Sequence, residues 1–319
     1  MIDLSDITKQ YARSMEYLAR VRDGSTGELT NGYWTVKVIG SELDEVKVTP
    51  LYEHLYSQRA PGFVSENDEI MQAITLVSSH MHGRGIWVMD RGGDRHRLYR
   101  PLLEDDLRFL IRQRGDRDLL WRGRRVLVRE LASLCPILYA ERLVRETDGK
   151  EKVCTIEYGY MRVRLPGRPE QLTLVVVWGF GQEPLMLLTN VKVRRSRKSV
   201  SFIVHSYLRR WQIEDTIRCS KQSYELENVR LLSYGRLQNM MVLALCAMYF
   251  SAVHLGDGIR LKVLMYRALT AAKRLFGIPD FRYYALADGI KALLEGFSKP
   301  FVARQVSRQP PVQTNLFDP

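Results

Sequence analysis

Short runs rich in β-branched and aromatic residues fill much of the first 195 residues, and this pattern limits the fold more than any other feature of the sequence. Residues 32–41 and 44–57 are two such runs, separated by a Gly-Ser pair that predicts a hairpin turn. Residues 85–90 form a short apolar run ending at Asp90, and residues 106–116 predict another strand of the same sheet. We therefore expect an α/β protein.

Helical signals interrupt and follow these runs. Apolar residues at helical spacing follow Ser65, which we predict to be an N-cap, and the first turn after it is acidic. Residues 91–94 predict a glycine turn. The last part of the chain predicts helices over residues 206–224, 234–255 and 261–277.

The pattern of residue types divides the chain into four parts. Residues 1–120 mix strands and helices, and residues 121–198 are predicted to be a mostly β insertion that includes the runs at 125–134, 152–166, 171–180 and 185–193. Residues 199–300 are predicted to be helical. The polar, proline-containing tail, residues 301–319, is predicted to be disordered.

Charge and cysteine content indicate the class of partner and compartment. Lys and Arg outnumber Asp and Glu by 48 to 36, so the formal charge is +12, which favours a polyanion such as nucleic acid or an anionic membrane surface. No apolar run reaches the roughly 18–20 residues that span a bilayer. The four cysteines form no CxxC pair, which indicates a reduced, cytoplasmic protein without a structural zinc site.

One basic helical stretch, residues 206–221, holds an acidic pair in its middle. At about 100° per residue, Tyr207, Arg210, Glu214 and Lys221 share one helix face about 60° wide, and Asp215 points about 100° away. A carboxylate among cations and a tyrosine suits a site that handles phosphate. The alternative is a solvated face with ordinary ion pairs, and we expect Asp215 to be a surface or pairing acid.

The spacing of these four residues carries a resemblance. Tyr-x2-Arg-x3-Glu-x6-Lys resembles the signature of bacterial insertion-sequence transposases of the DDE class, in the group called the fourth insertion-sequence family. The resemblance implies a ribonuclease-H-like catalytic core with a β-rich insertion between the second aspartate and the glutamate, followed by C-terminal helices. In that family the glutamate is a metal ligand, and the Tyr, Arg and Lys are associated with DNA.

Two aspartates should precede the glutamate on strands. Asp90, with Arg91 and Asp94, resembles the second aspartate motif, although Gly92 stands where the family often has a glutamate. Asp3, with Ser5 two positions on, resembles the family's first aspartate motif. Asp6, with Thr8 two positions on, is the alternative, and it stays open.

The resemblance implies a function and its partners. Asp3, Asp90 and Glu214 would hold two Mg²⁺ ions, with Mn²⁺ as a substitute, for in-line cleavage of insertion-sequence ends and strand transfer to target DNA. A homodimer on paired ends is implied, in a bacterial, nucleoid-associated setting. The predicted DNA-binding residues are Tyr207, Arg210, Lys221, Arg91, Arg194 and Arg195.

Three further expectations complete the sequence-based description. Leu185 and Met186 stand where family members can have a base-stacking tryptophan, so that role does not carry over, and Trp178 is expected in the core. Gln313–Phe317 resembles the pentapeptide that binds the bacterial sliding clamp. Only two residues precede Asp3, which suggests an N-terminally truncated chain; the alternative function is an inactive DNA-binding remnant or inhibitor of transposition.

Overall fold

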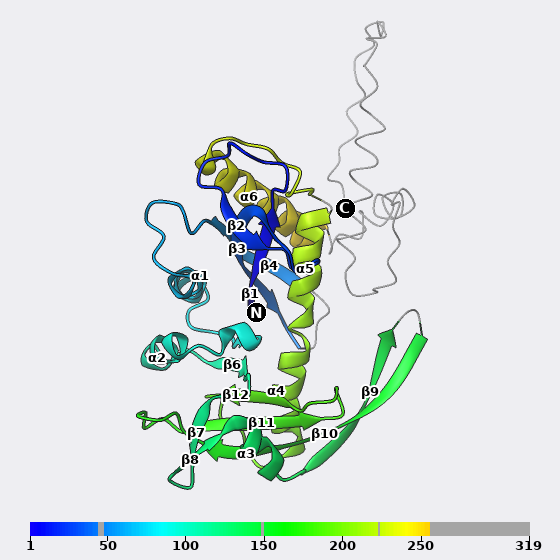
Figure 1. The fold of residues 1–319 in the computed structure, drawn as a ribbon. Helices are drawn as coiled ribbons and strands as arrows, with labels where there is room; N and C mark the ends of the chain where they lie inside the picture. The colour runs from blue at the N-terminus through cyan, green and yellow to red at the C-terminus, as the bar shows by residue number, and fades with distance from the viewer. Residues whose placement is uncertain (44–47, 148–149, 223, 256–319) are drawn as a thin grey trace, which may run out of the picture.

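Two large β-sheets, a small two-stranded sheet and the helices that join them make up the described part of the chain (Figure 1). The computed structural model describes residues 1–43, 48–147, 150–222 and 224–255. The strands are β1 Ile2–Thr8, β2 Ala19–Arg22, β3 Leu29–Ser41, β4 Val48–Tyr56, β5 Trp87–Met89, β6 Phe109–Arg112, β7 Asp118–Trp121, β8 Arg124–Leu127, β9 Tyr139–Thr147, β10 Lys150–Val163, β11 Leu172–Trp178 and β12 Leu185–Thr189. The helices are α1 Glu66–His80, α2 His96–Glu104, α3 Val128–Leu134, α4 Arg197–Leu208, α5 Trp211–Gln222 and α6 Tyr234–Tyr249, with a 3₁₀ turn η1 at Arg91–Gly93 and a π-helical segment η2 at Phe250–Leu255.

The first sheet is built around the 13-residue strand β3, which pairs antiparallel with β1, β2 and β4. The β3–β4 pairing confirms the predicted hairpin. The predicted Gly-Ser turn is wrong, because Gly40 and Ser41 still pair with Thr49 and Val48 inside the ladder. Backbone pairing across both edges of β3 places Asp3, Lys37 and Glu53 in one row across three strands.

The second sheet has the order β5-β6-β12-β11-β10-β9. Strands β5 and β6 are parallel, which confirms that residues 106–116 supply another strand to the sheet that ends at Asp90. The other neighbours are antiparallel, and β12 pairs directly with β6. Strands β9 to β12 of the predicted β-rich insertion therefore extend the same sheet that carries Asp90, whereas β8 pairs with β7 in a separate two-stranded sheet.

Helices fit the sequence predictions unevenly. The Ser65 cap is confirmed, since its hydroxyl accepts the amide of Asp68 at the start of α1. Helix α2 was not predicted, and residues 128–134 were wrongly predicted as β. In α3, Val128, Leu131 and Ala132 are buried at spacings of three and four residues, a helical face that is too short to stand out among neighbouring strands.

The predicted single helix over residues 206–224 is also corrected. Helix α4 ends at Leu208 and α5 begins at Trp211, so Arg209 and Arg210 form a turn between them. In Figure 1 the two helices follow one another along the side of both sheets. Helix α4 packs on the second sheet and α5 on the first, so the turn lies where the two sheets meet.

Helix α6 covers the first sheet beyond α5. Its buried residues Leu237, Met241 and Ala244 pack with Tyr33 and Leu55, which confirms the helix predicted over residues 234–255. No helix in the described part of the chain combines the length and apolar character needed to cross a bilayer. The helix predicted at 261–277 and the tail lie outside the described residues.

A buried ion pair ties α5 to the first sheet. Lys37 on β3 contacts Glu53 on β4 at 3.1 Å, and each side chain is 1% exposed. The Lys37 ammonium also donates to the Ser220 hydroxyl on α5. Burial raises the pKa of Glu53, against the opposing effect of Lys37. Water hardly reaches either charge, so each depends on its buried partner to offset the cost of burial.

We expect Lys37→Met to lower the free energy of unfolding by about 3–5 kcal/mol, because it leaves the Glu53 carboxylate buried without its cation. The measurement is urea denaturation at neutral pH. The matched control is the double variant Lys37→Met/Glu53→Leu, which removes both charges and should lose less stability than Lys37→Met alone. Equal losses in the two proteins would contradict this explanation.

Candidate active site

The three predicted acids come from three different elements. Asp3 is the second residue of β1, Asp90 directly follows β5, and Glu214 lies in the first turn of α5. Strands β1 and β5 lie next to each other although they belong to different sheets. The junction of the sheets therefore gathers residues that are far apart in the chain.

Arg210 joins two of these acids. Its Nη1 lies 3.2 Å from Asp3 Oδ2, and its Nη2 lies 2.5 Å from Glu214 Oε1. The guanidinium carbon also lies 6.0 Å from the centre of the Tyr207 ring. The Arg210 side chain is only 10% exposed, so these charge-assisted contacts form in a site of limited water access.

Negative charge is crowded around Asp3. Burial, the largest cause, and the nearby Asp90 carboxylate raise the pKa of Asp3 to about 7, although Arg210 opposes the shift. Glu214 adds a smaller effect in the same direction as Asp90. The Arg210 guanidinium thus contacts two of the three carboxylates, and a further cation would stabilise the three acids in their ionised form.

The chemistry of these donors suits a divalent metal ion. Carboxylate oxygens are the ligands that Mg²⁺ and Mn²⁺ prefer. Within the residues that the structure describes, no three His, Cys, Asp or Glu side chains already stand together as a ligand set, and Arg210 lies between Asp3 and Glu214. The carboxylates fit a metal by charge and donor type, with the guanidinium occupying the position between two of them.

Two buried polar atoms beside the acids have no hydrogen-bond partner among the described residues: Tyr207 Oη and Arg210 Nε. Buried donors without partners are uncommon and mark places where a polar ligand can bind. Tyr207 itself is 6% exposed, and the Arg210 guanidinium lies over its ring.

The turn after β5 is shaped by its aspartates. Asp90 caps η1 and accepts the Gly92 amide at 2.6 Å. A Cβ at position 92 would lie 2.8 Å from Asp90 Oδ1, so glycine at this position permits the close contact. Arg91, beside it, is exposed and lies 3.8 Å from Glu183.

Asp94, the second aspartate of the turn, has a structural role. Its side chain is 1% exposed and contacts Arg117 at 2.6 Å. It also accepts the Arg114 amide at 2.9 Å and lies 3.2 Å from the Tyr99 hydroxyl. Asp94 thereby fastens the Asp90 turn to the loop after β6.

The alternative first acid, Asp6, lies in a different set of contacts. Asp6 Oδ2 pairs with Lys221 at 2.9 Å, and Asp6 Oδ1 accepts the Gly24 amide at 3.2 Å. The structure therefore brings Asp3 to Arg210 and Glu214, whereas Asp6 and Lys221 meet each other. Lys221 does not share the contacts of Arg210 and Glu214 that its helix position predicted.

The other residues singled out in the sequence are placed as follows. Asp215, expected to be a surface or pairing acid, is buried at 8% exposed and pairs with Arg218 at 3.4 Å, and burial raises its pKa. Trp178 packs against the core as predicted. Leu185 and Met186 are buried in β12. Arg194 and Arg195 are exposed in the loop before α4.

Comparison with known proteins identifies the family. The family model described as a transposase DDE domain matches residues 50–250, more than half of the chain. The chain belongs to the DDE transposase family. A search of curated proteins finds no match. Transposase DDE domains generally use divalent metals and act on DNA, in agreement with the carboxylate site.

The family match covers Asp90 and Glu214 but begins after Asp3. The place of Asp3 in this transposase therefore depends on the geometry, in which it shares Arg210 with Glu214. Trp211, which has no predicted role in the sequence, follows Arg210 directly and is 59% exposed. The signal available in the sequence was a tryptophan directly after an arginine of the charged motif.

We expect Asp3→Asn to change how stability depends on pH in the metal-free transposase. Because the pKa of Asp3 is raised to about 7 in the folded protein, above about 3.9 in an unfolded chain, the folded state holds its proton more tightly. Stability of the parent should fall relative to Asp3→Asn as pH rises from about 4 to about 7.

The measurement is denaturant unfolding in EDTA across that range. Asp105→Asn, at an exposed position after α2, is the matched control and should follow the parent. Parallel stability curves for Asp3→Asn and the parent would show that Asp3 titrates normally.

Proposed function

We propose that the protein is a transposase of the fourth insertion-sequence group that cleaves DNA at the ends of an insertion sequence and joins them to target DNA, with Mg²⁺ or Mn²⁺. The observation that carries this proposal is the shared contact of Asp3 and Glu214 with Arg210, beside Asp90, in a chain of the DDE family. Asp3, Asp90 and Glu214 would hold the metal, which when bound activates the attacking oxygen and stabilises the leaving oxygen.

The chain's own residues have distinct parts in this proposal. Asp90 is fixed by the Gly92 amide, so it presents one carboxylate oxygen in a set direction. Arg210 balances Asp3 and Glu214 and can turn its fork toward a phosphate, since a guanidinium binds two oxygens at once. Tyr207 presents the face of its ring to the Arg210 guanidinium and so helps to orient it.

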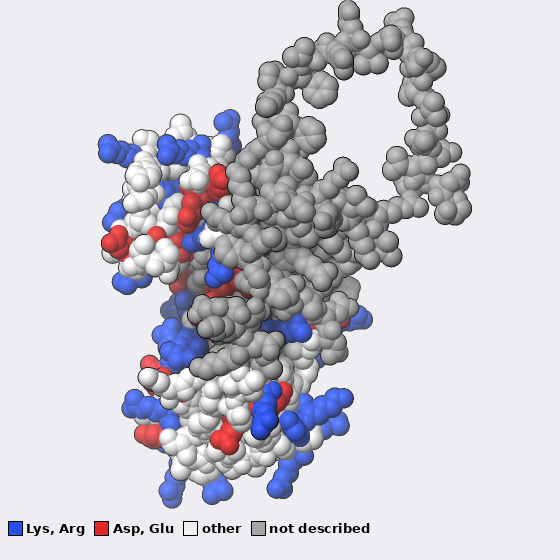
Figure 2. All heavy atoms as spheres, turned by 90° about the vertical axis from the view of Figure 1, so that its right-hand side faces the viewer, with Lys and Arg blue, Asp and Glu red and all other residues white. Residues whose placement is uncertain are grey.

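Basic side chains on the surface favour DNA as the substrate. Figure 2 shows Lys and Arg on both halves of the visible face, with a dense group at the waist between the halves, next to acidic side chains. Arg91, Arg194 and Arg195 are exposed and available for sequence-independent phosphate contacts. Pairing of two copies on paired ends stays a prediction, and the clamp-like Gln313–Phe317 lies outside the described residues.

We expect Glu214→Gln to reduce cleavage of DNA carrying the element's terminal repeats at least about 100-fold, because a neutral amide cannot compensate the metal charge at the reacting phosphate. The assay is strand cleavage with Mg²⁺ or Mn²⁺, and EDTA should abolish it. Glu157→Gln, at an exposed position on β10, is the control and should cleave like the parent. Undiminished cleavage by Glu214→Gln would exclude Glu214 as a ligand; DNA binding without any cleavage by the parent would indicate an inactive remnant.

We expect Trp211→Ala to weaken DNA binding by about 1–3 kcal/mol, since an exposed indole beside the site can stack on a base. The measurement is a gel shift or fluorescence anisotropy titration with a pre-cut DNA end. Tyr11→Ala is the control, because Tyr11 is 77% exposed but follows the end of β1 opposite to Asp3. An equal loss in both variants would argue against a specific contact by Trp211.

A further inference from the structure

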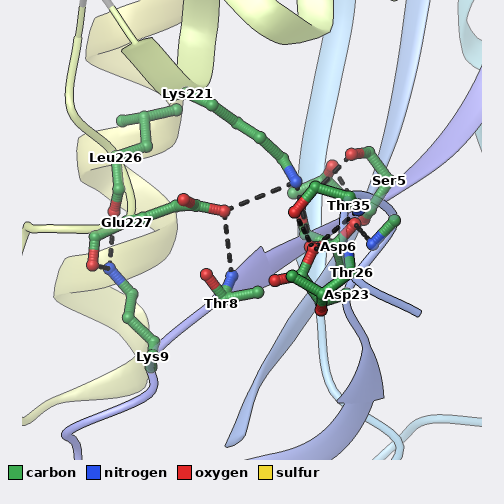
Figure 3. A network of polar contacts seen from close by, with 12 residues as sticks. Ser5, Asp6, Thr8, Lys9, Asp23, Thr26, Thr35, Lys221, Leu226 and Glu227 are labelled. Atoms are coloured by element: carbon green, nitrogen blue, oxygen red, sulfur yellow. Dashed lines mark hydrogen bonds and ion pairs between the residues drawn. The ribbon is translucent and has the colours of Figure 1, made fainter. Parts of the chain in front are cut away.

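A second polar network joins β1 to α5 beyond the candidate active site (Figure 3). Lys221, near the end of α5, lies 2.9 Å from Asp6 and 3.4 Å from Glu227. The same Glu227 oxygen accepts the Thr8 amide at 3.3 Å. Lys221 thus contacts a strand residue and a loop residue, and Glu227 in turn holds the end of the strand.

Lys9 fixes the loop that supplies Glu227. It is 3% exposed, and its ammonium donates to the carbonyl oxygens of Leu226 at 2.5 Å, Glu227 at 3.1 Å and Val229 at 2.6 Å. All three donor positions of the ammonium are used on one loop. The backbone after α5 is therefore tied to the residue that directly follows β1.

This network shares its two elements with the candidate active site. Asp3 and Asp6 both lie on β1, and Glu214 and Lys221 both lie on α5. Arg210 joins strand and helix at the Asp3 end, and Lys221 joins them at the Asp6 end. These two ion-pair contacts between the same strand and helix fix both the distance between β1 and α5 and their register.

We propose that Asp6, Lys9, Lys221 and Glu227 are positioning residues that hold β1 and α5 in register, so that Asp3 and Glu214 face a common metal site. This inference rests on the proposed function, since it concerns the geometry of the same acids. It assigns Lys221 an effect through Asp6 and Glu227, in contrast to the DNA contact that the family resemblance implies for this lysine.

Burial gives these contacts their weight. The Asp6 side chain is 6% exposed and that of Lys221 is 20% exposed, so the pair is well shielded from solvent. Loss of one partner leaves the other charge poorly solvated and allows strand and helix to shift. Outer contacts that orient metal ligands typically change metal affinity or activity by about 10–100-fold when removed.

The test is Mn²⁺ binding to the DNA-free protein, measured by electron paramagnetic resonance, for Lys221→Met and Asp6→Asn. We expect each to weaken Mn²⁺ binding about 10–100-fold, and the double variant to be little worse than either single one. Lys221→Arg keeps the charge and should retain most of the affinity. If Lys221 instead contacts DNA, Lys221→Met will bind Mn²⁺ like the parent, and the salt slope of its DNA binding will fall by about one.

Controls separate positioning from general instability. Arg100→Met breaks an ion pair with Glu104 in which the arginine is 73% exposed, and should leave Mn²⁺ affinity unchanged. If Asp6→Asn fails to fold, Glu227→Gln replaces it in the test, because the Glu227 side chain is 34% exposed. Circular dichroism checks that each variant is folded. Unchanged Mn²⁺ affinity in folded Lys221→Met and Glu227→Gln would overturn this inference alone, whereas a parent that binds no Mn²⁺ would overturn the proposed function.

Discussion

The contact of Arg210 with Asp3 and Glu214 is the constraint on which the rest of the site depends. Asp3 lies 207 residues before Arg210, and the two meet only because α4 and α5 pass along both sheets and turn at their junction. Arg210 stands in that turn, with α4 anchored to one sheet and α5 to the other. Asp3 and Glu214 belong to the first sheet and the helix packed on it, whereas Asp90 follows β5 of the second sheet, so any shift between the sheets would change the distance from Asp90 to the other two acids.

Helical arithmetic predicted part of this arrangement. Arg210 and Glu214 are four residues apart, and their ion pair follows from that spacing although the helix starts only at Trp211. Lys221 was predicted on the same face, yet its partners are Asp6 and Glu227. A helix face gives a direction, whereas the residue opposite depends on the strand that packs there, which spacing within the helix cannot specify.

The local signals of the sequence were sound where side chains act on their own backbone. Ser65 caps α1, and Asp90 ends β5, because both depend on neighbours within three residues. The order of strands was not accessible, since pairing of β12 with β6 joins residues about 80 positions apart. The burial of Asp94 could not be predicted either, because its partner Arg117 lies 23 residues further along the chain, in a loop.

The charge distribution explains how a basic protein can maintain an acidic site. A formal charge of +12 attracts a polyanion, but it does not neutralise a buried group, because side chains exposed elsewhere are screened by solvent. The ionisation of Asp3 depends on its immediate surroundings: burial and the nearby Asp90 oppose it, and Arg210 favours it. A divalent cation beside Asp3 would favour its ionised form and so oppose the rise in pKa that burial and Asp90 cause. The surplus of basic side chains on the surface and the shortage of them at the acids thus serve the two requirements of DNA phosphoryl transfer, attraction of the backbone and affinity for metal.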